Sequence, residues 1–171
     1  MRFFRALCAV LGALLIVPAL PSASFATDAP TVSEAFVLTK DGQLVDTLRE
    51  EPRVGVYEGL NVRYMKPEDI GGQVELTVSD LSFISLTLVM EALANATETG
   101  GDLVLMVKPQ FEVGKHRIGR GGVVHEESAR REAVEKVQAS AVSHGLRVMG
   151  MEPSPLPGQD GNVEYFLWCK K

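Results

Sequence analysis

The sequence is poor in cysteine and histidine, and these shortages exclude two classes of protein. Its 171 residues include two cysteines and three histidines. Two cysteines cannot build the disulfide framework of a small secreted domain, and these few ligands show none of the spacings of a zinc site. A net charge of -5 excludes a basic surface over the whole chain, although it permits a local one. We therefore expect no disulfide framework and no bound metal.

The remaining composition is that of a soluble globular protein. Hydrophobic residues make up 46% of the chain and charged residues 23%. The length suffices for one domain with a sizeable core. The chain has no internal repeat and no low-complexity tract.

Residues 1–26 differ in composition from the rest of the chain and resemble a secretory signal peptide. Arg2 and Arg5 give a positive start, residues 6–20 are mostly apolar, and residues 24–26 (SFA) offer a cleavage site. The apolar run is shorter than the roughly 20 residues that a membrane span needs. The alternative is a wrongly assigned gene start or a frameshift. Residues 27–41 read as a linker that contains one short strand.

From residue 42 to residue 171 the pattern is typical of an α/β domain. Alternation of apolar residues at strand and helix periods predicts the elements. The predicted strands cover residues 35–38, 53–57, 73–78, 103–107, 146–151 and 163–169, and the predicted helices cover residues 43–49, 85–96 and 126–144, with the last two helices ended by Gly100-Gly101 and Gly145. Strands alternating with helices imply a mostly parallel sheet, and the loop before the last strand implies that this strand is antiparallel.

The apolar run 103–107 (LVLMV) ends directly at Lys108. An unbroken run of this kind indicates a strand buried on both faces. Ligands bind at the carboxyl edge of open α/β sheets, and a lysine is rarely buried there unless its charge or basicity is used.

Three ionisable residues fall at predicted strand ends: Asp80, Lys108 and Glu164. Parallel strands bring the first two to one edge, and an antiparallel last strand brings the third there. A lysine flanked by carboxylates stays protonated unless a second cation or desolvation intervenes. The alternatives are a buried salt-bridge cluster or three unrelated solvated residues.

Residues 114–122 form a glycine-rich basic loop that carries Lys115, His116, Arg117 and Arg120. Backbone amides and cations of this kind suit phosphates, so the loop could hold a nucleic-acid backbone near Lys108. The spacing is not that of a P-loop, and a solvated mobile loop is the alternative. Asn61 could contact a ligand after the preceding strand.

Several longer segments together resemble a known family. They are residues 42–44 (GQL), 46–54 (DTLREEPRV), 61–63 (NVR), 80–86 (DLSFISL), 101–112 (GDLVLMVKPQFE), 119–124 (GRGGVV) and 153–168 (PSPLPGQDGNVEYFLW). In this order they closely resemble the TlyA family, also called hemolysin A. Its members look like S-adenosylmethionine-dependent ribosomal RNA methyltransferases with an FtsJ-like catalytic domain.

The resemblance implies 2'-O-methylation of cytidine in ribosomal RNA, with S-adenosylmethionine as cofactor, ribosomal subunits as partners, no metal and a cytoplasmic location. It also implies a Lys-Asp-Lys-Glu tetrad, of which three members map to Asp80, Lys108 and Glu164. Asn61 and Asp80 are then expected at the cofactor, and the RNA-binding residues are expected to be Lys115, Arg117 and Arg120.

The sequence departs from the family pattern before residue 42. The first tetrad lysine, the S4-like RNA-binding module and the glycine-rich cofactor loop have no counterpart, and Leu38 stands where the family has an acidic residue for the cofactor ribose. We therefore expect a Rossmann-like methyltransferase sheet with an antiparallel last strand, incomplete at the cofactor-loop side. The strand 53–57 should lack a neighbour, residues 6–20 should not fill the gap, and cofactor binding should be weak or absent.

Two functional readings follow for a chain of this kind. The first is a ribosomal RNA 2'-O-methyltransferase impaired at its N-terminal side. The alternative is a non-enzymatic remnant of that scaffold, either exported or binding RNA. No segment after residue 26 is amphipathic enough to predict a membrane partner.

Overall fold

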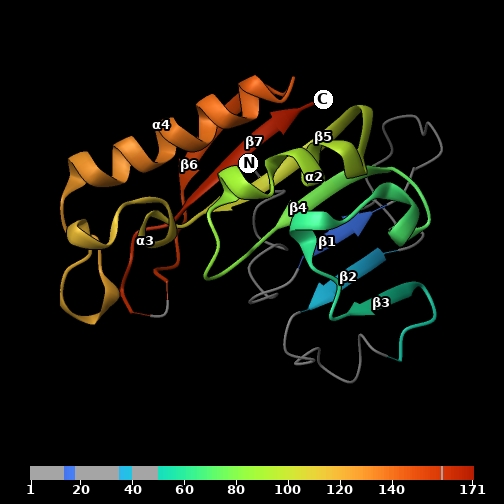
Figure 1. Ribbon diagram of the computed structural model, residues 1–171, viewed down its shortest axis with the longest axis horizontal. Coiled ribbons are helices and arrows are strands. Elements are labelled where there is room, and N and C mark those ends of the chain that lie inside the picture. The colour runs from blue at the N-terminus through green and yellow to red at the C-terminus, as the bar shows by residue number, and fades with distance from the viewer. Residues whose placement is uncertain (1–13, 18–34, 40–49, 159) are drawn as a thin grey trace.

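A computed structural model describes residues 14–17, 35–39, 50–158 and 160–171. Within these ranges the chain forms a seven-stranded sheet in the order β3-β2-β1-β4-β5-β7-β6 (Figure 1). The strands are β1 (Leu14–Val17), β2 (Ala35–Thr39), β3 (Val54–Glu58), β4 (Val74–Ser79), β5 (Thr97–Val107), β6 (Arg147–Pro153) and β7 (Tyr165–Lys170). The helix predicted at residues 43–49 lies outside the described residues.

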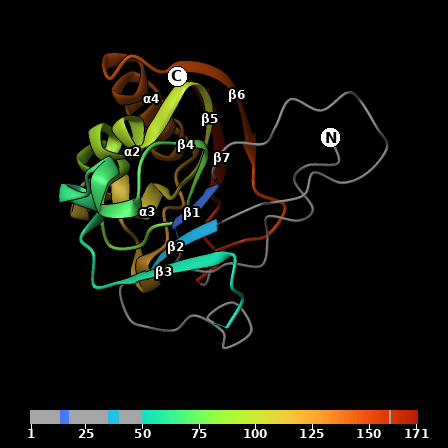
Figure 2. The same ribbon diagram turned by 90° about the vertical axis from the view of Figure 1, so that its right-hand side faces the viewer.

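One face of the sheet is covered by helices. The α-helices are α2 (Met90–Ala96), α3 (Pro109–Glu112) and α4 (Glu127–Ser143), and short 3-10 turns occur at Val62–Tyr64, Pro67–Ile70, Leu86–Leu88, Lys115–Arg117 and Arg120–Gly122. Figures 1 and 2 show α2 and α4 on the same side of the sheet. Leu93 of α2 and Val137 of α4 pack against Leu103, Leu105 and Leu167 in one apolar core. The helix α4 therefore buries the stripe that its sequence periodicity predicts.

Strand directions bring several strand ends to one edge. β2 is parallel to β3, β4 is parallel to β5, and β1 runs antiparallel to both β2 and β4. The strands β2, β3, β4 and β5 therefore all end at the same edge. β7 is antiparallel to β5 and begins there, since Tyr165 pairs with Val107. We call this the site edge, and its predicted construction from β4, β5 and β7 is confirmed.

The centre of the sheet corrects the expectation of an unfilled gap. Leu14 of β1 pairs with Leu38 on one side and with Ser79 on the other, so the apolar segment does join β2 to β4. Backbone groups exposed on both neighbours favour any extended apolar segment that satisfies them. Because β1 is reversed, its last residue, Val17, lies at the edge opposite the site edge. The signal peptide and its cleavage site remain predictions, since residues 1–13 and 18–34 lie outside the described ranges.

The strand before Lys108 is longer than predicted. β5 begins at Thr97 rather than at Leu103, so Gly100 and Gly101 lie inside the strand and do not end a helix. The Thr97 hydroxyl lies 2.7 Å from that of Thr77, and Gly100 N–H donates to the carbonyl of Lys171 at 2.9 Å. Pairing with β4 and with the chain end thus outweighs the helix-stop signal of the two glycines.

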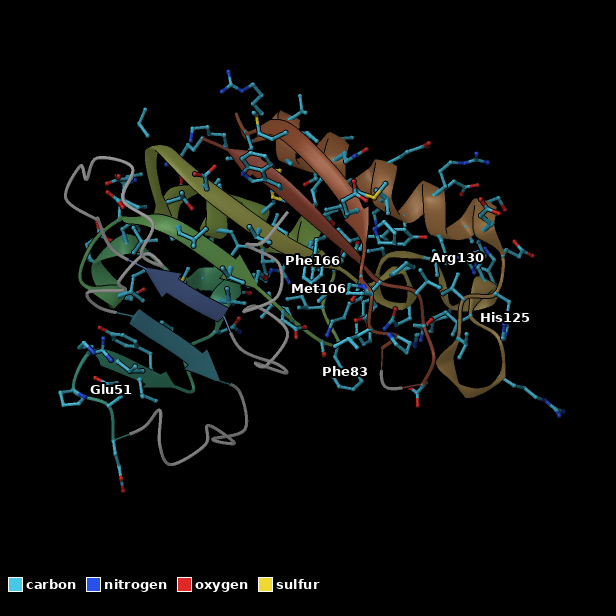
Figure 3. All side chains as sticks on the ribbon, turned by 180° about the vertical axis from the view of Figure 1, so that it is seen from behind. Glu51, Phe83, Met106, His125, Arg130 and Phe166 are labelled. Carbon is cyan, nitrogen blue, oxygen red and sulfur yellow. The ribbon has the colours of Figure 1, made fainter. Side chains whose placement is uncertain are left out.

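The second face of the sheet is only partly covered. Leu103, Leu105 and Val107 are fully buried, whereas Val104 and Met106 are half-buried, so the prediction of a strand buried on both faces is wrong. Met106 pairs with Phe166 on this face, which Figure 3 shows from behind. Trp168 is 41% exposed and donates its indole N–H to Asp102 at 2.8 Å. No helix among the described residues is long and apolar enough to cross a bilayer.

Candidate active site

Asp80 and Lys108 extend the adjacent strands β4 and β5 at the site edge. The Nζ of Lys108 lies 2.5 Å from Oδ1 of Asp80, and their side chains are 9% and 16% exposed. The next residue, Pro109, begins α3 and turns the chain away from the sheet. The sequence predicted this convergence, and the geometry makes it a close ion pair.

Ser82 also contacts Lys108, and the sequence analysis did not predict this contact. The Nζ of Lys108 donates a hydrogen bond to Ser82 Oγ at 3.1 Å. Ser82 lies in the loop between β4 and α2, where no periodicity fixes the direction of a side chain. Within the part of the chain that the structure describes, the ammonium contacts these two partners, and its third donor is available to a ligand.

Glu164 directly precedes β7 and reaches the same edge. It is 8% exposed, and its Oε1 accepts from Nε2 of Gln110 at 3.0 Å. Within the described ranges no ion pair joins it to Lys108. The Oε1 of Gln110 is buried and, among the described residues, has no hydrogen-bond partner. The structure thus brings the three predicted residues to one edge, with Glu164 beside the Asp80–Lys108 pair rather than inside it.

Glu112 is a further buried carboxylate that the sequence did not single out. Its oxygens accept from Ser85 Oγ at 2.5 Å and from the backbone N–H of Leu86 at 2.7 Å. Lys136 of α4 lies 3.7 Å from the carboxylate and donates to the Glu112 carbonyl at 2.9 Å. Burial raises the pKa of Glu112 above its ordinary value, against the opposing effect of these donors. The residue ties the loop after Asp80 to the turn after Lys108.

An exposed aromatic side chain, Phe83, lies in the loop after β4 and contacts a half-buried one, Phe111. Phe83 is 85% exposed, and its ring centroid lies 5.2 Å from that of Phe111. Its backbone is left-handed, with φ 63°, which is rare for a bulky residue and marks a strained position of a kind that clusters at functional sites. Figure 3 labels Phe83 on the loop that follows β4. The exposed ring offers a flat apolar surface on the residue after Ser82, the hydrogen-bond partner of Lys108.

The basic loop, residues 114–122, is attached to α4 by ion pairs, unlike the solvated mobile loop considered as the alternative. Arg117 is ion-paired to Glu132 of α4 and lies 3.7 Å from Glu126, and hydrogen bonding to Glu132 raises the pKa of its guanidinium. Lys115 and Arg120 are exposed. Of the three predicted RNA-binding residues, the structure therefore leaves two facing solvent and uses the third to attach the loop to α4.

The two residues expected at the cofactor, Asn61 and Asp80, are both engaged within the protein. Oδ1 of Asn61 accepts from the N–H of Arg63 at 3.1 Å and caps the turn after β3. Asp80 is occupied by Lys108. Because β1 is reversed, the site edge receives its first residue, Leu14, and not a turn following the strand. The described residues thus present no glycine-rich turn at the centre of this edge to approach a cofactor.

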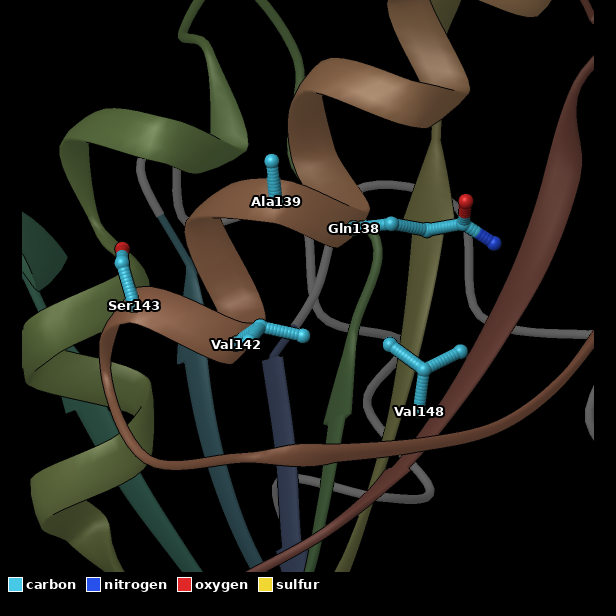
Figure 4. Close-up of a pocket in the computed structure, with 5 residues that line it drawn as sticks. All are labelled: Gln138, Ala139, Val142, Ser143 and Val148. Atoms are coloured by element: carbon cyan, nitrogen blue, oxygen red, sulfur yellow. The ribbon is translucent and has the colours of Figure 1, made fainter.

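A shallow pocket of about 510 Å³ lies away from these residues. It is lined by Gln138, Ala139, Val142, Ser143 and Val148 (Figure 4). Val148 is near the start of β6, at the end of the sheet opposite the site edge. In the described part of the chain no cluster of acidic, histidine or cysteine side chains could hold a metal ion. Cys169 is fully buried, and desolvation raises its pKa to about 11, as expected for a packing residue.

The strand order and the antiparallel last strand define a Rossmann-like α/β domain. A solved methyltransferase from Mesorhizobium loti shares this fold at 11% identity, with a TM-score of 0.56 over 82% of this chain and 81% of that one. Residues 35–171 match the family of FtsJ-like methyltransferases. The chain belongs to this family.

Closer relatives have more specific names. The chain is 51% identical over 129 residues to the 16S/23S rRNA (cytidine-2'-O)-methyltransferase TlyA of Mycobacterium tuberculosis, covering 75% of this chain and 48% of the relative. It is 28% identical over 124 residues to hemolysin A of Brachyspira hyodysenteriae, covering 72% of this chain and 52% of the relative. A solved structure of a candidate hemolysin from Streptococcus thermophilus is 39% identical, with a TM-score of 0.78 over 82% of this chain and 51% of that one. The chain spans about half the length of the curated relatives it matches.

Proposed function

We propose that the domain binds ribosomal RNA at the site edge and holds a ribose 2'-hydroxyl there as the acceptor of a methyl group. The observation that carries the proposal is the ion pair of Lys108 with Asp80 beside Glu164. Its context is a chain 51% identical to a ribosomal RNA cytidine 2'-O-methyltransferase over 129 residues. The acceptor is RNA rather than DNA, because only RNA carries the 2'-hydroxyl.

Each residue of the site has a role in this proposal. The free donor of the Lys108 ammonium binds the ribose oxygen, and Asp80 and Ser82 hold that ammonium in place. A role of Lys108 as a base would require a further cation to offset the charge of the Asp80 carboxylate. Glu164, kept in position by Gln110, is the nearby carboxylate that can accept the hydroxyl proton. Asp80, Lys108 and Glu164 are thus the proposed catalytic residues.

The surroundings of the site support an RNA ligand. Exposed Phe83 offers a face on which an unpaired base can stack, an interaction worth about 1–3 kcal/mol per base. The exposed cations Lys115 and Arg120 lie on the loop that follows Lys108 and suit phosphates. Ribosomal subunits in the cytoplasm are the partners that this ligand implies.

S-adenosylmethionine is the methyl donor that the relatives imply, and we expect these 171 residues alone to bind it weakly or not at all. In this proposal the described residues bind the RNA that accepts the methyl group, and they do not form a site for the methyl donor. A second candidate function follows from this mismatch: an RNA-binding protein that retains the scaffold without methyl transfer.

Two titrations on the full chain test RNA binding at the site and the expected lack of cofactor binding. A calorimetric titration with S-adenosylmethionine should give no heat of binding up to millimolar ligand. Fluorescence anisotropy with a cytidine-containing ribosomal RNA hairpin should give saturable binding, weakened about tenfold or more by Lys108→Met. Micromolar binding of S-adenosylmethionine would contradict the expected mismatch. Equal RNA affinity in wild type and Lys108→Met would contradict the proposal that RNA binds at Lys108. Sequencing the N-terminus of the natural protein tests export, which predicts a start at Thr27.

A further inference from the structure

Gly158 lies directly against the carboxylate of Glu164. A Cβ placed on Gly158 would come within 2.5 Å of Oε1, 2.9 Å of Cδ and 3.4 Å of Oε2. The backbone of Gly158 is not left-handed, so the glycine is not needed for its conformational freedom. Its feature is the close approach to Glu164, because a side chain at this position would force the Glu164 carboxylate to shift.

The loop that contains Gly158 closes around Glu164. Ser154 N–H donates to the Glu164 carbonyl at 2.8 Å, and the Glu164 side chain is held by Gln110 on another segment at 3.0 Å. Inside the loop, Gly158 N–H donates to the Asn162 carbonyl at 2.8 Å. The position of Gly158 therefore depends on Asn162, and the position of the carboxylate depends on Gly158.

Asn162 joins this loop to the basic loop. The residue is 2% exposed, its Oδ1 accepts from the N–H of Val124 at 3.0 Å, and its Nδ2 donates to the Gly122 carbonyl at 3.1 Å. Gly122 ends the 3-10 turn that begins at Arg120. One buried amide thus bridges the exposed cations and the glycine that confines Glu164.

We propose that Gly158 and Asn162 are positioning residues that couple the basic loop to the Glu164 carboxylate. Gly158 sets where the carboxylate lies, and Asn162 transmits the position of the loop that carries Lys115 and Arg120. A phosphate held by those cations then fixes Glu164 relative to the neighbouring ribose. The coupling step rests on the proposed function for the identity of the ligand, whereas the placement of Glu164 by Gly158 does not.

Gly158→Ala tests the placement in the protein without RNA. Gly150→Ala is the matched control, because a Cβ at Gly150 would meet nothing within 4 Å and its backbone is not left-handed. Carboxyl carbon NMR of ¹³C-labelled protein, with the Glu164 signal assigned by its loss in Glu164→Gln, follows one group through a pH titration. The chemical shift and the titration midpoint of Glu164 should both move in Gly158→Ala and stay unchanged in Gly150→Ala. An unmoved Glu164 signal in Gly158→Ala would overturn the proposal.

A double-mutant cycle measured by Tm distinguishes a specific conflict between Gly158→Ala and Glu164 from a general packing defect. With Glu164→Ala in the background the steric conflict is gone, so Gly158→Ala should raise Tm by about 1–4 °C by restricting the unfolded chain. In the wild-type background the same change should give no increase or a decrease. Equal changes in Tm in both backgrounds would show that Gly158 and Glu164 are not coupled, and the proposal would fail.

Asn162→Ala tests the coupling with the ribosomal RNA hairpin as the probe. In wild type the Glu164 signal should move when the hairpin binds. In Asn162→Ala that movement should fall by more than half, while Kd changes by less than about threefold, since the cations remain. A full Glu164 response in Asn162→Ala would refute the coupling. If the hairpin does not bind wild type, the proposed function fails together with the coupling, whereas the Gly158 result is unaffected.

Discussion

The ammonium of Lys108 lies 2.5 Å from the carboxylate of Asp80, and the two residues extend neighbouring parallel strands past the sheet. With side chains 9% and 16% exposed, the pair is largely removed from water. A more accessible, half-buried pair exists between Lys170 and Asp102, at 3.3 Å with side chains 34% and 35% exposed. The chain thus contains a largely buried pair and a more accessible one with which to compare it.

Breaking the buried pair should destabilise the fold more than removing it altogether. Asp80→Asn leaves a nearly buried ammonium without its counter-charge, and we expect it to lower the free energy of unfolding by about 2–4 kcal/mol. The double variant Asp80→Asn/Lys108→Met should recover part of that loss. Urea unfolding measures the cycle. The coupling free energy should exceed about 1 kcal/mol for this pair and stay below it for Lys170 and Asp102. Equal coupling in the two pairs would contradict the prediction.

The sequence predicts the Asp80–Lys108 contact because strand direction alone brings those ends together. Ser82, Gln110 and Glu112 escape prediction, since their partners depend on how short loops fold over the edge. The pairing of β1 was predicted wrongly, because β-pairing follows available backbone groups as well as family order. The space at Gly158 also has no sequence signal, as glycines serve turns and close contacts alike.

Arg117 should contribute less to RNA binding than its charge suggests. Its guanidinium is engaged by Glu132 and lies near Glu126, whereas Lys115 and Arg120 face solvent. We expect Lys115→Ala and Arg120→Ala each to weaken binding of the ribosomal RNA hairpin and to reduce the salt slope of log K by about 0.7–0.9. Glu132→Gln should strengthen binding at low salt by releasing Arg117. Anisotropy titrations at several salt concentrations check this, with Arg131→Ala on α4 as the control. A weaker complex with Glu132→Gln would refute this role for the ion pair.

We expect the Phe83 ring to contribute to RNA binding while its left-handed backbone lowers the stability of the fold. Its φ of 63° is unfavourable for a bulky residue, so Phe83→Gly should unfold no more easily than wild type, despite the loss of contact with Phe111. The same variant should bind the hairpin about fivefold or more weakly if a base stacks on the ring. Urea unfolding and anisotropy separate the two effects. Phe83→Leu controls for apolarity, because it keeps the strain and the apolar surface but not the ring. Unchanged affinity in both variants would exclude a stacking role.

Glu112 should make stability depend on pH in the opposite sense to most carboxylates. Burial raises its pKa in the folded protein, so the folded state holds a proton that the unfolded state has already lost. The stabilising contribution is therefore complete below the ordinary value of about 4.5 and declines as the pH rises from there through the folded pKa.

Glu112→Gln removes this titration and keeps an acceptor for Leu86. The free energy of unfolding of wild type minus that of Glu112→Gln, from urea unfolding between pH 4.5 and 8, should fall with rising pH. Taking the difference cancels carboxylates such as Glu132, whose pKa is lowered by Arg117 and whose effect has the opposite sign. A difference that rises with pH would mean that Ser85, Leu86 and Lys136 outweigh burial.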